Sequence, residues 1–384
     1  MTEPFGTLNP SPRLLLGPGP SQISPRVLRA CATPLLGYLD PEYVALMDET
    51  QSLLRQVFGT DNEWTVCAPG TGMAGMEAAF VNILEPGDPV LICVQGIFGE
   101  RMVEIARRCG ADVTRVDAEW GEAIRPEQVE AALKKVRAKA VAIVHGETST
   151  GVLQPLEEIA RIAHEHEALF TVDCVTSLGG VPVEVDRLGI DVVYSGTQKC
   201  LGAPPSLAPM SFSQAAVQAY KARKKLVQSF YLDMGQMWRY WGPERGYHQT
   251  GMINMIYALR EALLEMQEEG LEPRYERHRR NQRALVAGCE AMGLSLLVQD
   301  PALRLPPLTT VLIPEGVDDK TVRGRLLTQY GIEIGGGLGK FAGRAWRIGL
   351  MGYASRQANV MLLLSALGDV LKNERVDEGL AAAS

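Results

Sequence analysis

Two residues of this sequence stand where an α/β protein places reactive groups. Lys199 follows the apolar run 190–193 and precedes a tight Gly-Ala-Pro-Pro turn, and Asp173 ends the apolar run 169–173. If both runs are strands, the two side chains lie at strand carboxyl ends, where loops face the crevice of the sheet. A lysine that is desolvated there has a lowered pKa and can attack an aldehyde as a neutral amine.

Asp173 adds a second kind of chemistry to this pair. A carboxylate at a strand end can pair with the protonated nitrogen of a pyridine cofactor and keep the ring an effective electron sink. Each residue also has an ordinary interpretation, because Lys199 could be a surface lysine and Asp173 a turn or N-cap residue. Their occurrence at the ends of two successive predicted strands favours the chemical interpretation.

Three other segments carry groups that suit a phosphate, a flat ring or a carboxylate. The Gly-rich turn 69–73 precedes a predicted helix, whose N-terminus suits a phosphate, although neither the dinucleotide nor the Walker spacing is present. Phe98 follows a predicted strand and could stack on a ring or fold back into the core. Arg347 lies in an apolar strand and needs a carboxylate or phosphate partner, from a ligand or from an internal salt bridge.

Other reaction classes find less support in the residues. His145 opens the polar loop 145–151 and is interpreted as a structural histidine. No zinc-type ligand spacing and no Ser-His-Asp signature is present, so neither a metal site nor a hydrolase is predicted.

The elements that must carry these residues alternate between strands and helices, which predicts an α/β fold with a mostly parallel central sheet sandwiched by helices. The predicted strands are 65–67, 89–94, 113–116, 140–145, 169–173 and 192–195, and the predicted helices between them include 75–84, 99–109, 126–137 and 156–166.

A smaller α+β domain is predicted after about residue 272. A long helical stretch, 255–269, continues into a charged segment, 272–292, that links the two domains. We therefore expect an N-terminal arm (1–25), a large domain (26–271) and a small C-terminal domain (272–384). The small domain has predicted strands at 295–299, 309–313, 332–335 and 346–349 and predicted helices at 320–330 and 356–372.

Composition limits the partners and the compartment. A net charge of -7 and a pI near 5.5 argue against nucleic acid, and the basic stretches 221–225 and 274–283 are interpreted as solvated helix faces. No apolar run approaches the roughly 20 residues of a membrane helix, and the N-terminus has no signal-peptide pattern. Seven single cysteines without a CxxC pair predict reduced thiols. A cytoplasmic protein without a membrane or nucleic-acid partner is expected.

Taken together, these residues resemble the class V branch of the fold-type I aminotransferases, and most closely the alanine–glyoxylate and serine–pyruvate group. The resemblance covers nearly the whole chain. It rests on segments that occur in the same order, at 14–20, 84–88, 145–155, 194–199, 300–306 and 335–339. Relatives often carry His at position 73, Trp at 98 and His at 249, where this chain has Met73, Phe98 and Gln249, and these differences bear on the substrate.

The resemblance implies that the cofactor is pyridoxal 5′-phosphate and assigns a role to each matching residue. Lys199 would hold the cofactor as a Schiff base and act as acid and base, and Asp173 would bind the pyridine nitrogen. Arg347 would bind the substrate carboxylate. The other cofactor contacts would be Val175 and Phe98 on the two ring faces, Thr148 at the ring hydroxyl, and Thr71, Gly72, Met73 and Gln198 at the phosphate.

The same resemblance implies a homodimer with shared active sites. Tyr247 and Thr250 match the pair that a partner subunit contributes to the phosphate site in this family. The implied reaction moves an amino group from a small amino acid, alanine or serine, to glyoxylate or pyruvate, through a Lys199 aldimine and pyridoxamine intermediates.

Several alternatives remain open. A serine–glyoxylate or ureidoglycine–glyoxylate aminotransferase would keep the cofactor and change the donor. Cysteine desulfurases share this fold but carry histidine at the positions that match Phe98 and Gln198, so desulfurase activity is disfavoured. A non-catalytic regulator on this fold usually carries a DNA-binding domain, for which about 25 residues before the sheet region leave no room. A plain nucleotide-binding module is the remaining alternative.

Overall fold

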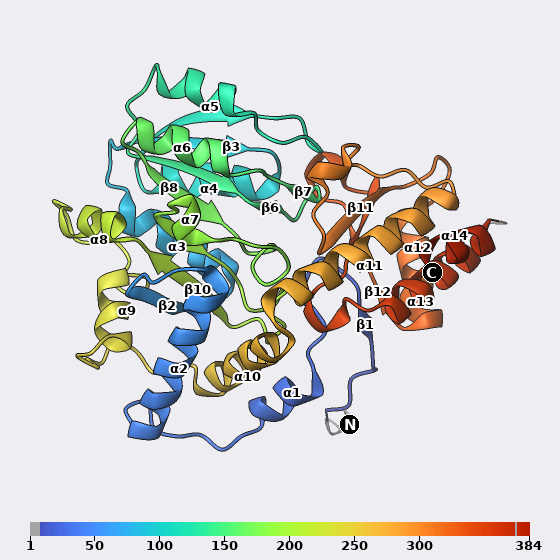
Figure 1. Ribbon diagram of the computed structural model, residues 1–384, viewed down its shortest axis with the longest axis horizontal. Helices are drawn as coiled ribbons and strands as arrows, with labels where there is room; N and C mark the ends of the chain where they lie inside the picture. Colours follow the sequence, from blue (N-terminus) through green and yellow to red (C-terminus); the bar gives the residue numbers. More distant parts are fainter. Residues whose placement is uncertain (1–7, 373–374) are drawn as a thin grey trace, which may run out of the picture.

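The computed structural model describes residues 8–372 and 375–384. Its centre is a seven-stranded sheet with the strand order β2-β10-β9-β8-β5-β3-β4 (Figure 1). The sheet is mostly parallel, as predicted, because only β10 runs antiparallel to its neighbours. The strands are β2 (Trp64–Pro69), β3 (Pro89–Val94), β4 (Asp112–Asp117), β5 (Ala140–Val144), β8 (Leu169–Asp173), β9 (Val192–Tyr194) and β10 (Leu207–Phe212).

Helices surround this sheet (Figure 1). Helix α3 packs on β9 and β10, and α4 packs on β3 and β4, so both begin next to the ends of buried strands. The helices of this part are α1 (Pro25–Cys31), α2 (Pro41–Phe58), α3 (Gly72–Ile83), α4 (Ile97–Arg108), α5 (Pro126–Leu133), α6 (Glu157–Glu165), α7 (Val185–Leu188), α8 (Gln214–Lys221), α9 (Met234–Trp241) and α10 (Ile253–Glu269).

The C-terminal part has its own sheet and its own apolar core. Strands β11, β14 and β13 form an antiparallel sheet, and the N-terminal β1 joins this part by pairing with β12. One buried apolar cluster extends from Val27 to Met266, and a second contains Leu16 and residues from Leu285 onward. The elements are β1 (Leu14–Leu15), β11 (Leu308–Leu312), β12 (Ile332–Glu333), β13 (Gly335–Gly336), β14 (Ala345–Gly349), α11 (Leu271–Ala291), α12 (Asp319–Tyr330), α13 (Gln357–Leu371) and α14 (Val376–Ala383).

Three expectations differ from the structure. The predicted strand 295–299 is wrong, because Leu296 makes only an isolated bridge to Val311. The basic stretch 221–225 is not a helix face, because α8 ends at Lys221. The basic stretch 274–283 does lie on α11, but its first arginine, Arg274, is buried. Burial requires polar partners that this stretch does not itself supply.

Two short elements complete the surroundings of the strand ends. Strands β6 (Gly146–Glu147) and β7 (Val152–Leu153) form a small antiparallel pair after β5. The remaining single turns are η1 (Pro301–Leu303), η2 (Gly339–Phe341) and η3 (Gly352–Ala354). Within the described ranges, no helix is both long and apolar enough to span a membrane.

Candidate active site

Lys199 lies in the turn after β9 and is only 8% exposed. Its amine donates a hydrogen bond to the carbonyl of Pro18. Burial lowers the pKa of Lys199 to about 8, and the charge of Arg347 acts in the same direction. A neutral amine is therefore accessible near neutral pH, as a nucleophile or a general base requires.

The segment that covers this lysine comes from the N-terminal arm. The backbone N–H of Ser21 donates to the carbonyl of Gln198 at 2.8 Å, and the Ser21 hydroxyl donates to the carbonyl of Lys199 at 2.7 Å. Gly19 has φ +106°, and a Cβ at this position would lie 2.6 Å from the lysine Nζ. Only glycine fits there. The sequence pattern singled out the 14–20 segment only as part of a family resemblance.

Asp173 ends β8 directly beside Tyr194 on β9. Its carboxylate is 2% exposed; Oδ1 accepts a hydrogen bond from Val175 N at 2.8 Å, whereas Oδ2 has no partner among the described residues. Burial raises the pKa of Asp173 to about 7. A buried carboxylate oxygen without a partner is costly. A protonated ring nitrogen is the type of ligand that would satisfy it.

The start of α3 converges with Gln198. Thr71 is the N-cap of α3 and Gly72 its first residue, so their neighbouring N–H groups have no acceptor within the helix. A Cβ on Gly196 would lie 2.8 Å from the Gln198 side-chain oxygen and 3.2 Å from Gly72 N. The buried Gln198 Oε1 has no partner within the described chain. Because a half-turn of the amide presents its NH₂ group at the same place, this corner suits an anion such as phosphate.

Side chains that could contact a ring also gather here. Val175 lies against the start of α3, because a Cβ on Gly72 would be 2.7 Å from Val175 Cγ2. Phe98, in the first turn of α4, is half-buried, with the Arg101 guanidinium 4.8 Å from its ring centre. Arg101 also contacts the sulfur of Met73 at 3.4 Å. The Thr148 hydroxyl is buried and hydrogen bonds to the hydroxyl of Thr176.

Arg347 projects from β14 and is 7% exposed. Its Nε donates to the carbonyl of Gly336 at 2.8 Å, and its Nη1 donates to the carbonyl of Thr148 at 3.2 Å. Burial lowers the pKa of Arg347 to about 10, and the charge of Glu147 opposes that shift. Within the described residues, no carboxylate lies within ion-pair distance of Arg347, so the geometry favours a ligand carboxylate over an internal salt bridge.

Sequence reasoning missed Glu147, which organises the start of α4. Its fully buried carboxylate accepts hydrogen bonds from Ser149 N at 3.0 Å and from the Ser149 hydroxyl at 2.6 Å. The Ser149 Oγ in turn accepts from Ile97 N at 3.0 Å, at the beginning of the helix that carries Phe98. The only signal was the polarity of the 145–151 loop. His145, also buried there, bonds Ser177 Oγ at 3.0 Å, and burial lowers its pKa to about 4, in keeping with a structural role.

Two predicted site residues lie apart from this cluster. Tyr247 and Thr250 are on the exposed loop between α9 and α10, and Tyr247 is 55% exposed. The ring of Tyr247 packs against Tyr38, with ring centres 5.1 Å apart. Among the described residues, no hydrogen bond or ring contact connects either side chain with Lys199 or with the start of α3.

Comparison with known proteins places this geometry in a family. The family model described as aminotransferase class-V matches residues 14–353. The chain is 42% identical to (S)-ureidoglycine–glyoxylate transaminase of Bacillus subtilis, over 96% of this chain and 93% of that protein. It is also 42% identical to alanine–glyoxylate aminotransferase of Callithrix jacchus, over 94% and 88% of the two chains.

A solved structure agrees with these sequence matches. Alanine–glyoxylate aminotransferase from Nostoc sp. superposes with a TM-score of 0.94 at 49% identity, covering 96% of this chain and 97% of that chain. The lowered pKa of the buried lysine, the unpaired Asp173 oxygen and the anion corner at α3 all fit pyridoxal phosphate. The chain belongs to the class-V aminotransferases, enzymes of fold type I that depend on pyridoxal phosphate.

Proposed function

We propose that the protein transfers the amino group of a small amino acid, alanine as the first candidate or serine, to glyoxylate or pyruvate. The observation that carries the proposal is the grouping of Lys199, Asp173 and Arg347: the charges of Arg347 and Asp173 both act on the buried lysine amine. A substrate bound by its carboxylate at Arg347 would therefore have its amino group near Lys199. Relatives named for alanine–glyoxylate transfer support this choice of substrates.

Each residue of this group has one task. Pyridoxal phosphate, when bound, supplies the electron sink for the carbanion at the substrate Cα. Lys199 carries the proton to and from that carbon, and its lowered pKa suits such work near neutral pH. Asp173 holds a positive charge on the ring nitrogen. Arg347 binds and orients the carboxylate through its planar fork. Val175, Phe98 and Thr148 would contact the ring of the bound cofactor, and Thr71, Gly72, Met73 and Gln198 would bind its phosphate.

A second donor, ureidoglycine, is supported by a specific observation. The Bacillus subtilis protein named for ureidoglycine–glyoxylate transfer is 42% identical to this chain, over 96% of this chain, and the alanine–glyoxylate relative is also 42% identical. The two candidates differ in the donor only.

Absorbance of the cofactor-loaded protein distinguishes the donors. Alanine, serine, glycine and ureidoglycine are each titrated alone, and glyoxylate or pyruvate is then added. Under the proposal, alanine changes the visible absorbance and glyoxylate restores it. A response to serine or ureidoglycine alone would keep the enzyme class and replace the donor, and no response to any of them would contradict a transaminase of small amino acids.

Replacing Arg347 with alanine is expected to raise KM for both the amino acid and the oxo acid by about 10–100-fold, because a hydrogen bond to a charged group contributes about 1.5–3 kcal/mol. Steady-state kinetics measures the change. Arg344→Ala, three positions earlier and exposed, is the matched control and should leave both KM values unchanged. Equal effects of the two substitutions, or an unchanged KM in Arg347→Ala, would remove Arg347 from the carboxylate site.

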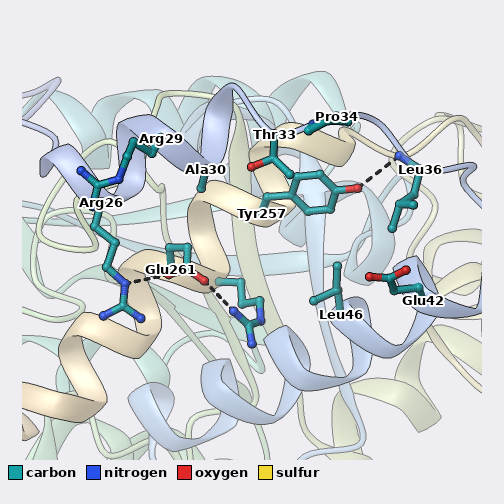
Figure 2. Close-up of a pocket in the computed structure, with 11 residues that line it drawn as sticks. Arg26, Arg29, Ala30, Thr33, Pro34, Leu36, Glu42, Leu46, Tyr257 and Glu261 are labelled. Carbon is teal, nitrogen blue, oxygen red and sulfur yellow. Dashed lines mark hydrogen bonds and ion pairs between the residues drawn. The ribbon is translucent and has the colours of Figure 1, made fainter.

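We also propose a homodimer in which Tyr247 and Thr250 complete the phosphate site of the other subunit. Exposed apolar side chains support this assembly: Leu35, Tyr38, Phe230 and Tyr247 are all exposed, Tyr38 packs on Tyr247, and Phe230 packs on His248 with ring centres 5.3 Å apart. An exposed surface of this kind is typical of interfaces. A cavity of about 460 Å³ lies between α1, α2 and α10 and is lined by Thr33, Pro34 and Leu36 among others (Figure 2).

Subunit mixing tests the shared site. Lys199→Ala and the double variant Tyr247→Ala/Thr250→Ala should each be inactive as purified, whereas a mixture that exchanges subunits should recover about a quarter of wild-type activity, because hybrid dimers contain one complete site. If Tyr247 and Thr250 instead acted within their own subunit, the mixture would be as inactive as the two separate variants. Mixing Lys199→Ala with Asp173→Asn is the control. Both residues belong to the site of one subunit, so each site of the hybrid carries one defect and mixing should restore no activity.

Two broader assignments accompany this function. We place the enzyme in the cytoplasm, which seven free cysteines support. We keep the division into an arm (1–25), a large domain (26–271) and a small domain (272–384), which the two separate apolar clusters support.

A further inference from the structure

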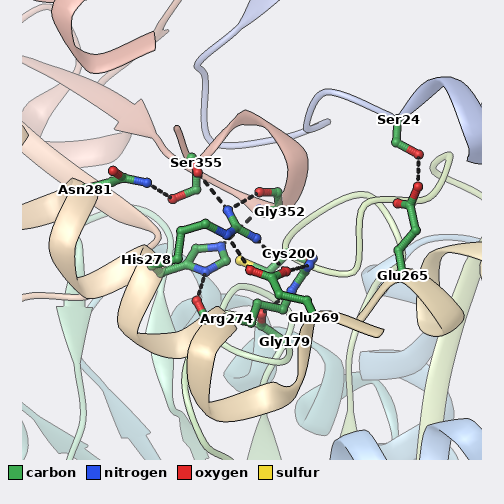
Figure 3. A network of polar contacts seen from close by, with 11 residues as sticks. Ser24, Gly179, Cys200, Glu265, Glu269, Arg274, His278, Asn281, Gly352 and Ser355 are labelled. Atoms are coloured by element: carbon green, nitrogen blue, oxygen red, sulfur yellow. Dashed lines mark hydrogen bonds and ion pairs between the residues drawn. The ribbon is translucent and has the colours of Figure 1, made fainter. Parts of the chain in front are cut away.

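A partly buried cluster of two arginines and one glutamate lies where helix α10 ends and helix α11 begins; Figure 3 shows it around Arg274 and Glu269. Glu269, at the end of α10, accepts from Arg274 Nη1 at 2.8 Å and from Arg277 Nε and Nη2 at 2.5 and 2.9 Å. The side chains of Arg274 and Arg277 are 7% and 22% exposed. One carboxylate therefore orients two guanidinium groups and partly neutralises them.

Arg274 uses its other nitrogens on the turns that follow two strands of the central sheet. Its Nη2 donates to the carbonyl of Cys200 at 2.7 Å, next to Lys199, and its Nε donates to the carbonyl of Gly179 at 3.1 Å, in the segment after β8. With Ser21 on Gln198 and Lys199, three consecutive carbonyls at the lysine are each bound. The backbone of Lys199 is thereby held from the N-terminal arm and from α11.

Arg277 and His278 hold the segment that follows β14. Arg277 Nη1 donates to the carbonyls of Gly352 and Ser355 at 2.9 and 2.7 Å. Gly352 N donates to His278 Nε2 at 3.0 Å, and His278 Nδ1 is 2.8 Å from the carbonyl of Arg274. Figure 3 shows His278, Gly352 and Ser355 close together. Since Arg347 is on β14, the same helix start binds the backbone beyond both Lys199 and Arg347.

We propose that Arg274 and Arg277, oriented by Glu269, are positioning residues that set the separation between the Lys199 amine and the Arg347 guanidinium, and so decide which carboxylate substrates fit. The inference rests on the proposed function, in which these two groups hold the two ends of the amino acid. Arg274 acts on the lysine side and Arg277 on the arginine side. The link is rigid, because each guanidinium is planar and bonds at several points.

A merely structural interpretation predicts something different. The two arginines donate four hydrogen bonds outside Glu269, and all four end on backbone carbonyls; three of these carbonyls lie in the segments that follow β9 and β14, and the fourth follows β8. Replacing a residue that only stabilises the fold would lower the folded fraction and leave KM unchanged. Replacing a positioning residue should raise KM. Because such a residue acts through Arg347, this effect should vanish when Arg347 is absent.

The experiment is a double-mutant cycle on the cofactor-loaded enzyme. Arg277→Ala should raise KM for the amino and oxo acids about tenfold with a smaller change in kcat. A misplacement of about 1 Å at a reacting group can lower catalytic efficiency by up to ~10²-fold. Arg277→Lys should recover part of the loss. In the Arg347→Ala background, Arg277→Ala should have little further effect on KM. Arg283→Ala, exposed on the same helix and paired with Glu276, is the matched control.

Arg274→Lys tests the lysine side without any substrate. The pH midpoint of the visible cofactor absorbance should shift relative to wild type, and thermal unfolding of the same sample shows whether the variant is folded. Additive KM effects in the cycle, or KM values for Arg277→Ala equal to those of Arg283→Ala, would overturn the proposal. If the wild type processes none of the amino acids, the proposed function fails. The absorbance midpoint of Arg274→Lys then decides alone, and an unchanged midpoint overturns the positioning role.

Discussion

Replacing Lys199 with alanine is expected to abolish transamination, with a loss of at least about 10²–10⁴-fold in kcat, because Lys199 is the only buried lysine among the described residues and no other lysine can replace it in moving the proton. The structure offers no substitute among the described residues near the turn after β9, where Ser21 and Pro18 face the lysine backbone and amine. The visible absorbance of the added cofactor should also lose the band that borohydride bleaches in wild type. Absorbance spectra before and after borohydride, together with kcat, measure both effects.

The substitution should leave the fold intact. Burial lowers the pKa of Lys199 to about 8, so folding removes a proton-binding group from water at a cost that alanine avoids. This cost lowers the free energy of unfolding of the wild type below pH 8, and it fades as the pH rises toward the ordinary lysine pKa. Thermal unfolding near wild type therefore accompanies the lost activity. Lys340→Ala, an exposed lysine over Trp120, is the control. Residual activity within tenfold of wild type would exclude Lys199 from the chemistry.

Local patterns were sufficient to predict the strands that carry these groups. Strands β3 and β8 begin and end where the apolar runs predicted, because buried parallel strands are continuous apolar segments bounded by polar residues. Asp173 therefore stands at a strand end in both the prediction and the structure. Strand β10 lies between β2 and β9 although it contains Pro209, whose missing N–H normally confines proline to edge strands.

Interactions between distant segments were beyond such patterns. The fit of Gly19 over Lys199 joins two segments that periodicity treats independently. Arg274 has the spacing of a solvated helix residue and is buried only because carbonyls and Glu269 from elsewhere surround it. The segment 295–299 has strand-forming residues, yet it pairs with β11 only around Leu296, and the Gln299 side chain donates to the carbonyl of Leu296 at 2.5 Å.

Site residues that depend on assembly with a second chain are even further beyond the reach of local sequence patterns. Tyr247 and Thr250 were assigned by resemblance alone, and in one chain they lie on an exposed loop. A pattern in a single sequence contains no information on a second copy, and a single chain cannot complete a site that two chains share. Their assignment stays a prediction that subunit mixing addresses.

Asp173→Asn is expected to lower kcat by about 10²–10³-fold, as removal of one group that stabilises charge at a reacting centre often does. Its effect on stability should reverse with the cofactor. In the cofactor-free protein, burial raises the pKa of Asp173 to about 7 from an ordinary 3.8. The folded state keeps the proton that the unfolded state releases, so stability falls as pH rises from about 4 to about 7, by an amount on the order of 4 kcal/mol.

Asparagine carries no such cost, so cofactor-free Asp173→Asn should unfold at a higher temperature than wild type at pH 8 and lose that advantage near pH 4. With pyridoxal phosphate bound, the order should invert, because the carboxylate then faces a positive ring nitrogen and the amide cannot match that charge. Thermal unfolding of both proteins, with and without cofactor at the two pH values, gives the four comparisons. If wild type remains the more stable without cofactor at pH 8, then the unpaired Asp173 oxygen is not the cost that the cofactor relieves.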